Sequence, residues 1–319
     1  MKSAEVNISV PKNDGSPETP IPNERVAQLD ALPGYGQTLR IAGNGYEYEA
    51  FFSLRNRRIR VTGYNAMHYE RMMHSLKTHA LQQNAGKIFI KAPINDRPLL
   101  CELGFSKEAT ISGYFNGRSA VVMSVFLDTQ RQQPTVPLSK REAIVCRAQQ
   151  PPTAGKARLS QANGVYIRIA TEEDAQMLAA LFRANFASYP FPVFDAAYVH
   201  SCMKNDVVYM VAEMEGTIAA VASAETVPSL GNAEMTDFAT LHRFRGNGLG
   251  ALLLNALEKE MAQRHIHHLY TLARASSPSI NRIFGKAGYT YTGTLIQNCH
   301  ISGDFEDMNC WCKTVNSAP

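Results

Sequence analysis

The sequence lacks both the long apolar run of a membrane protein and the apolar leader of a secreted one. No stretch comes near the roughly 18 apolar residues that a membrane-spanning helix needs. The first residues, MKSAEVNISVPKNDGSPETPIPNE, are polar and hold no apolar core of about 7–15 residues. We therefore expect a cytoplasmic protein with no membrane partner.

Cysteines and basic residues are too few or too scattered for several other functions. The six cysteines form no CxxC pair and no disulfide framework, so we expect reduced thiols. The net charge is only +4 and the Lys and Arg residues are dispersed, which argues against a nucleic-acid partner. His265, His267 and His268 resemble a metal cluster, but they fall at a predicted helix-to-strand junction, where cationic residues are favourable. We expect no bound metal.

What remains is an ordinary globular composition divided by polar stretches. Of the 319 residues, 45% are hydrophobic, which is enough for two domains. Residues 1–25 have the composition of a disordered tail, residues 128–163 that of a linker, and residues 315–319 form a second short tail. The sequence thus predicts an N-terminal α/β unit over residues 26–127 and a larger α/β domain over residues 164–314.

The two predicted units end alike. Residues 86–126 and residues 267–311 each have the pattern of a strand, a helix and a hairpin. In both, the helix closes on a glycine between an aliphatic and an aromatic residue, at Gly104 and at Gly288. We interpret this similarity as an internal duplication, in which only the second copy follows a glycine-rich motif.

That motif lies in RFRGNGLGALLLNAL (243–257), where three glycines at alternate positions lead into an amphipathic helix. Such glycines let backbone N–H groups approach a phosphate at a helix N-terminus. The stretch GNGLGA also satisfies the dinucleotide-binding fingerprint, but HRFR separates it from the preceding strand and no acid occurs at 269–273. No Gly-Lys-Ser/Thr of a Walker P-loop is present. The motif therefore indicates another kind of phosphate loop.

RGNGLG (245–250) resembles the R-x-x-G-x-G/A pyrophosphate loop of the GNAT acetyltransferases. The segments AEMTDFATL, LYTLARA, GYTYTGTLIQN and GDFEDMNCW are similar to the β-lysine N6-acetyltransferases, as is the SGYFNG turn of the N-terminal unit, so the resemblance covers about residues 35–313. It implies an α/β protein whose C-terminal GNAT fold, a mixed central sheet flanked by helices, follows a degenerate half-GNAT-like unit. It also implies direct acetyl transfer from acetyl-CoA to β-lysine in a ternary complex. The product would be Nε-acetyl-β-lysine, a compatible solute used in osmoadaptation.

The resemblance also implies which residues hold acetyl-CoA. In the family, the strand before the loop pairs with pantetheine, and many members carry a tyrosine in the later helix that protonates the leaving thiolate. Phe284 stands at that position here, so the thiolate would leave unprotonated or take a proton from water or Tyr289. The residues expected to contact the cofactor are Phe238, Ala239, Thr240, Arg245, Gly246, Asn247, Gly248, Leu249, Gly250, Asn281 and Phe284.

Acyl transfer to an amine requires a base, because an ammonium group with a pKa of about 10.4 is almost wholly protonated at neutral pH. Two carboxylates, Glu234 and Asp237, lie on the strand that leads into the loop. In a regular strand residues three apart face opposite sides, unless a bulge intervenes. We favour Asp237 as the catalytic base because it is nearer the loop, and keep Glu234 as the alternative.

A site for β-lysine needs a cation for the carboxylate, acids for the second amine and apolar walls. Arg274 follows the strand LYTLA, and Glu306 or Asp307 of the DFED turn is expected on the substrate side. Tyr189 and Phe191 are candidate walls in the loop after the first helix of the C-terminal domain. A pseudo-symmetric packing of the two units would cover one end of the acceptor channel.

Other functions stay open at this point. The same loop would serve a GNAT enzyme that acts on another small amine or on a protein amine, and a closed acceptor tunnel would favour the small amine. A further alternative is a non-catalytic acyl-CoA-binding sensor, since the N-terminal unit resembles a module that has lost its loop. Whether the chain forms a homodimer is also open.

Overall fold

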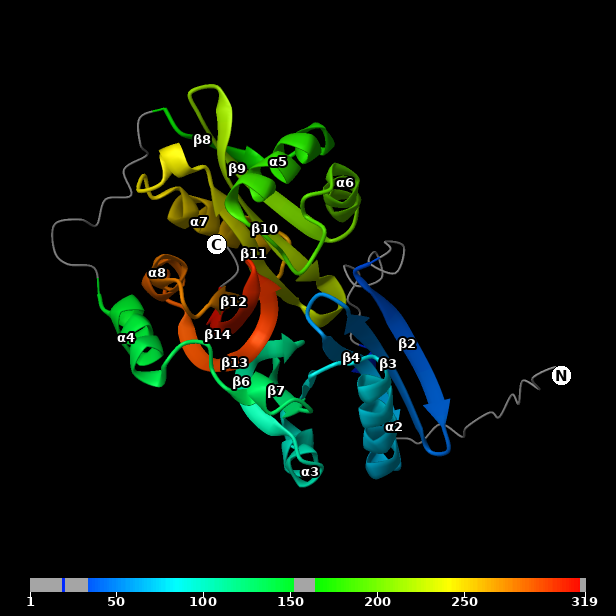
Figure 1. Ribbon diagram of the computed structural model, residues 1–319. Coiled ribbons are helices and arrows are strands. Elements are labelled where there is room, and N and C mark those ends of the chain that lie inside the picture. The colour runs from blue at the N-terminus through cyan, green and yellow to red at the C-terminus, as the bar shows by residue number, and fades with distance from the viewer. Residues whose placement is uncertain (1–18, 21–33, 152–163, 316–319) are drawn as a thin grey trace.

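The computed structural model describes residues 19–20, 34–151 and 164–315 (Figure 1). The remainder of the expected tails, and residues 152–163 of the expected linker, lie outside the described residues. Within the tail expected over residues 1–25, Thr19–Pro20 forms a short strand, β1, that pairs with β4. In the described part of the chain, no helix is both long and apolar enough to cross a bilayer.

The C-terminal half is built on a mixed seven-stranded sheet, sheet B, with the strand order β13-β14-β12-β11-β10-β9-β8. Helices α5 (Ala175–Asn185) and α6 (Ala196–Lys204) cover one face, and α7 (Leu249–Gln263) and α8 (Pro278–Lys286) cover the other. The strands are β8 (Tyr166–Ile169), β9 (Val207–Met214), β10 (Thr217–Val227), β11 (Asn232–Thr240), β12 (His268–Arg274), β13 (Thr290–Ile301) and β14 (Asp304–Thr314).

Helix α7 packs closely on this sheet because the two surfaces match. Its apolar residues recur at the spacing of one helical face, and Leu249, Leu253 and Leu257 are buried. Opposite them β10 presents only alanines at alternate positions, Ala220 and Ala222 among them. Small side chains let the helix approach the strands, and this places the N-terminus of α7 at the end of β11.

The N-terminal half repeats most of this topology in sheet A, whose main path is β2-β3-β4-β5-β7-β6. Each sheet contains one pair of parallel strands joined through a helix, β4–β5 in sheet A and β11–β12 in sheet B. In each sheet the second strand of the closing hairpin, β7 or β14, pairs with the later strand of that parallel pair, β5 or β12. Among the described residues, sheet A has no counterpart of β8, α5 or α6. The elements are β2 (Gly36–Gly43), β3 (Tyr46–Ser53), β4 (Arg58–Ala66), α2 (Tyr69–Gln82), β5 (Lys87–Pro93), η1 (Ile94–Asp96), α3 (Arg97–Glu102), β6 (Ser106–Phe115) and β7 (Arg118–Phe126).

The two halves pack through their closing hairpins, which share an apolar core (Figure 1). The β6–β7 turn reaches the β10–β11 connection of the other half, where the Asn116 amide donates to the Leu230 carbonyl at 2.9 Å. Conversely, the β13–β14 hairpin reaches the β3–β4 turn, where the His300 amide donates to Asn56 Oδ1 at 2.8 Å. This reciprocal packing is the pseudo-symmetry expected of a duplication. The SGYFNG turn lies beside the start of β12, since a Cβ on Gly113 would fall 2.0 Å from His268.

The described part of the segment expected to be a linker has regular structure of its own. It contains η2 (Gln130–Gln132) and helix α4 (Leu138–Gln149), which packs on α8. The approach is so close that a Cβ on Gly285 would lie 2.4 Å from the Ala148 carbonyl oxygen. A short apolar stripe of α4, including Val145 and Ala148, is buried in this contact. Residues 138–149 are therefore packed against the C-terminal half and do not form an exposed linker.

Candidate active site

Strands β11 and β12 are parallel neighbours only at their beginnings. Their pairing runs from Asn232–His268 to Glu234–Tyr270 and then stops. Beyond that point β11 stays paired with β10 as far as Thr240, and β12 stays paired with β14 as far as Arg274. We call this separation the β11–β12 split. Its two facing edges carry backbone groups that a ligand can pair with.

The predicted phosphate loop connects the split to helix α7. Gly246 (φ +88°) and Gly248 (φ +74°) adopt the left-handed conformation that favours glycine, and α7 starts directly after Gly248. The first N–H groups of the helix have no partner within it and, with the helix dipole, attract an anion. Arg245 closes the loop by donating to the Thr240 carbonyl at 3.3 Å and to Asn185 Oδ1 at 2.9 Å.

The remaining loop residues contribute through their backbone. Asn247 donates its side-chain amide to the Phe244 carbonyl, and the Leu249 side chain is buried in the core. A Cβ on Gly250 would fall 2.8 Å from Ile283 Cδ1, so α7 and α8 meet at this glycine. Phe238, Ala239 and Thr240 lie on the edge of the split, as expected for the strand that would pair with pantetheine.

Asp237 sits at a β-bulge in β11. Its φ is +53°, and the register between β10 and β11 shifts beside it. Because Glu225–Glu234 and Ser223–Thr236 are cross-strand pairs on one face, the bulge lets Asp237 join Glu234 on that face. The two candidate bases therefore do not face opposite sides, as they would in a regular strand.

The Asp237 side chain is buried and held from two directions. Tyr189 Oη donates to Asp237 Oδ1 at 2.8 Å, and Ser223 Oγ donates to Asp237 Oδ2 at 2.8 Å. The predicted wall residue Tyr189 is thus a partner of the predicted base. Phe191, in the same loop, is half-buried in the core of α5 and α6. Nothing in the sequence singles out Ser223, which meets Asp237 only through strand pairing.

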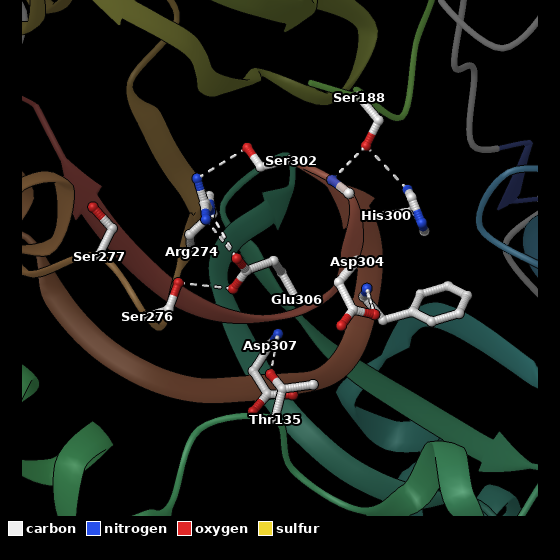
Figure 2. A network of polar contacts seen from close by, with 12 residues as sticks. Thr135, Ser188, Arg274, Ser276, Ser277, His300, Ser302, Asp304, Glu306 and Asp307 are labelled. Atoms are coloured by element: carbon white, nitrogen blue, oxygen red, sulfur yellow. Dashed lines mark hydrogen bonds and ion pairs between the residues drawn. The ribbon is translucent and has the colours of Figure 1, made fainter. Parts of the chain in front are cut away.

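Arg274 and Glu306 come together, but as partners of each other (Figure 2). Arg274 Nη2 lies 2.5 Å from Glu306 Oε1, and Nε of the same guanidinium lies 3.1 Å from that oxygen. Ser276 Oγ donates to Glu306 Oε2 at 2.8 Å, and Arg274 Nη1 donates to Ser302 Oγ at 3.3 Å. Most of the hydrogen-bonding capacity of this Arg–Glu pair is therefore used within the protein.

The tip of the β13–β14 hairpin is tied to the loop between α5 and α6 (Figure 2). The Ser302 amide donates to the Ser188 carbonyl at 3.0 Å, and the Gly303 amide donates to Ser188 Oγ at 2.9 Å. His300 Nδ1 also lies 3.1 Å from Ser188 Oγ. The loop that carries Tyr189 is thus joined to the hairpin that carries Glu306, an arrangement that the sequence alone does not reveal.

Two predicted site residues turn out to be structural. Asp307 is fully buried and accepts from the amides of Val136 and Gln297, so it does not lie on the substrate side. Asn281 is also fully buried: its amide group donates to the carbonyls of Arg274 and Ser277. Its oxygen accepts from Asn309 and Trp311. All its hydrogen bonds are made within the protein, so the expected contact of its side chain with pantetheine does not hold.

Phe284 has a packing role as well. Its side chain is fully buried, with its ring between those of Phe238 and Tyr289 at centroid distances of 5.4 and 5.0 Å. A direct contact with acetyl-CoA would require it to be exposed. Tyr289 is a poor proton donor for the thiolate, since burial raises the pKa of its hydroxyl and the nearby Glu258 carboxylate adds to the effect.

Comparisons with known proteins agree with this geometry. Residues 175–289 match the acetyltransferase (GNAT) family. The chain is 38% identical over 260 residues to the N-acetyltransferase YodP of Bacillus subtilis, covering 82% of this chain and 93% of that protein. It is 33% identical over 270 residues to a β-lysine N(6)-acetyltransferase of Methanosarcina mazei, covering 77% and 98%.

Among solved structures, the chain is similar to that of yncA from Salmonella typhimurium with its cofactor acetyl-CoA. That similarity has a TM-score of 0.43 and 17% identity and covers 49% of this chain and 96% of the other. The family match and the strand order of sheet B confirm the expected fold class. In the described residues no group of three or more His, Cys, Asp or Glu side chains is arranged to hold a metal ion.

Proposed function

The chain belongs to the GNAT family of acetyltransferases, which use acetyl-CoA as co-substrate, and on that basis we propose that it acetylates the N6-amine of β-lysine. The similarity to a β-lysine N(6)-acetyltransferase over most of both chains supports this acceptor. The product, Nε-acetyl-β-lysine, would serve as a compatible solute in osmoadaptation. We place the reaction in the cytoplasm, where acetyl-CoA is available.

In this proposal the phosphate loop holds the diphosphate of acetyl-CoA, and the β11–β12 split receives the pantetheine arm. The glycine conformations at Gly246 and Gly248, the start of α7 and the Arg245 guanidinium fit an anionic group of this kind. The edge of β11 at Phe238–Thr240 offers backbone groups to pantetheine and to the developing oxyanion.

The observation that carries the proposal is the fixed carboxylate of Asp237 beside the split. Deprotonating an ammonium group with a pKa of about 10.4 at neutral pH costs roughly 4–5 kcal/mol, which a positioned base can meet. The hydroxyl groups of Tyr189 and Ser223 each donate a hydrogen bond to an oxygen of Asp237, and these bonds orient the carboxylate beside the split.

The chemical step then follows in a ternary complex. Asp237 first takes a proton from the N6-ammonium group and passes it to solvent. The neutral amine then attacks the thioester carbonyl carbon, so that a C–N bond forms, and the second N–H proton passes to Asp237. Collapse of the tetrahedral intermediate breaks the C–S bond, and coenzyme A leaves as a thiolate that takes its proton from water. Phe284 supplies no acid for this step.

Thiol release measured with purified enzyme, acetyl-CoA and an amine panel tests the proposal. The panel contains β-lysine, α-lysine, ornithine, polyamines and a lysine-containing peptide. We expect the highest kcat/KM with β-lysine. A higher value with the peptide or with a polyamine would contradict the assignment, and binding of acetyl-CoA without release of thiol by any amine would indicate a sensor.

A further inference from the structure

The face of sheet A that packs on sheet B is unusually basic. It carries four cationic side chains at alternate positions of two neighbouring strands, namely Arg58 and Arg60 on β4 and Lys87 and Lys91 on β5. Lys87 pairs with Glu108 at 2.8 Å, Arg58 donates to the Asn298 carbonyl, and Lys91 donates to Tyr270 Oη at 2.7 Å. Three of the four therefore have partners within the protein.

Arg60 is the exception. Its Nη2 atom is buried, yet among the residues that the structure describes it finds no hydrogen-bond partner. Buried polar atoms in native proteins are almost always hydrogen-bonded, and an unsatisfied charged donor is especially costly. A guanidinium nitrogen in this state has the chemistry to receive an anion from outside the chain, and carboxylates are the anions that its planar fork fits best.

Glu234 of sheet B lies within range of the charge of Arg60, and Glu225 lies beside Glu234. Glu225 and Glu234 are direct cross-strand partners on β10 and β11, and like charges in such a pair are unfavourable. Burial raises the pKa of the Glu234 carboxyl; Lys91 and, more weakly, Arg60 oppose this shift, whereas the negative charge of Glu225 reinforces it. Two acids from one half of the molecule thus face two cations from the other, and a second ammonium group would relieve the repulsion between the acids.

Tyr270 connects the Glu234 carboxyl of sheet B to the Lys91 ammonium of sheet A. It hydrogen-bonds to Glu234, and the Lys91 ammonium lies between the rings of Tyr114 and Tyr270, at 4.8 and 4.6 Å from their centroids. Lys91 is 5% exposed, so its position is fixed by packing from both halves. It acts as a positioning residue that holds Glu234 and Tyr270 in place.

The cluster also lies at the right distance from the base. Glu234 belongs to the last residue pair before the split, and the bulge puts Asp237 on the same face. Three residues of strand span about 10 Å between Cα atoms, and side chains shorten the gap. β-Lysine has three methylene groups between its two amines, so an acceptor with N6 at Asp237 would bring its other amine and its carboxylate towards this cluster.

We propose that Arg60 of the N-terminal half binds the carboxylate of the acceptor, and that Glu225 and Glu234 of sheet B bind its second ammonium group. This assignment rests on the proposed function. It assigns recognition of the acceptor to the half that has no phosphate loop. Arg60 then takes the role expected of Arg274, whose guanidinium is engaged by Glu306.

Three acceptors distinguish the contact to the carboxylate from the contact to the second amine. β-Lysine has both groups, pentane-1,4-diamine is its analogue without the carboxylate, and 6-aminohexanoate lacks the second amine. In Arg60→Met, we expect the preference for β-lysine over pentane-1,4-diamine, as a ratio of kcat/KM, to fall about 10- to 100-fold, the range of one charged hydrogen bond. In Glu225→Gln and Glu234→Gln, the preference for β-lysine over 6-aminohexanoate should fall by a similar factor.

Two arginine variants serve as controls. Arg40→Met removes an exposed arginine of sheet A that pairs with Glu49, and should leave both ratios unchanged. If Arg274→Met abolishes the preference for the carboxylate while Arg60→Met keeps it, the proposal is wrong. A loss in Glu234→Gln that is equal for all three acceptors would make Glu234 a base instead of an ammonium ligand.

The test remains decisive if Arg60→Met is unstable. Calorimetric binding of acetyl-CoA shows whether the fold is intact, and Arg60→Lys, which keeps the charge but loses the fork, should still weaken the preference for β-lysine. Failure of the proposed function has a different signature, because wild-type enzyme would then show no preference for β-lysine over the two analogues. A wild-type preference that survives both Arg60 variants overturns only the present inference.

Discussion

At the level of single residues, the site depends on Asp237, whose backbone and side chain are both constrained. The left-handed conformation costs a non-glycine residue roughly 1–2 kcal/mol, although aspartate tolerates it better than most. The hydrogen bonds from Tyr189 and Ser223 help to hold it there. An outlier of this kind, kept by its surroundings, is characteristic of a functional position.

We predict that Asp237→Asn lowers kcat for β-lysine about 10²-fold, because the amide keeps the shape but accepts no proton. The loss should shrink as the pH rises towards the amine pKa of about 10.4, where the free amine needs no base. Steady-state kcat between neutral and alkaline pH measures this. Ser223→Ala, which leaves the carboxylate in place, should cost much less. If Glu234→Gln shows this pH pattern and Asp237→Asn does not, the base has been misassigned.

At the level of secondary structure, local patterns were predictable and distant contacts were not. The glycine loop, the stripe of α7 and the repeated hairpins follow from spacings within about 15 residues of sequence, which is the range over which helix and strand periodicity acts. The bulge at Asp237 was only a possibility in the sequence, since a bulge has no pattern of its own there. The structural role of Asn281 was not predictable because its partners Asn309 and Trp311 lie on β14, distant in sequence. The docking of α4 on α8 was missed because its apolar stripe is short.

For the loop, we predict that Gly248→Val and Arg245→Ala each raise the Kd of acetyl-CoA tenfold or more. Valine resists the φ of +74° that starts α7, and alanine removes the guanidinium beside the diphosphate. Isothermal calorimetry measures both. Gly104→Val is the matched control, because Gly104 has a φ of +90° in the α3–β6 turn of the N-terminal half. Unchanged affinity in both loop variants would rule out this phosphate site.

At the level of the whole chain, the two halves share a topology but differ in what they offer a ligand. Sheet B carries the glycine loop, the split and Asp237, whereas sheet A presents buried cations towards sheet B. The repeat itself was visible in the sequence through Gly104 and Gly288. The proximity of Arg60 and Glu234 was not predictable, because these residues are far apart along the chain and only the packing of the two halves brings them together.

In the proposed arrangement the acceptor would lie along one face of sheet B, with the reacting amine at Asp237 and the second amine at Glu225 and Glu234. The position of the acetyl group on the product therefore tests the account as a whole. Wild-type enzyme would be incubated with acetyl-CoA and β-lysine, and the product analysed by two-dimensional NMR, which separates the methylene next to N6 from the methine next to the 3-amine. We predict acetylation at N6 alone. Acetylation at the 3-amine, or no acetylated β-lysine under conditions in which another amine reacts, would contradict the account.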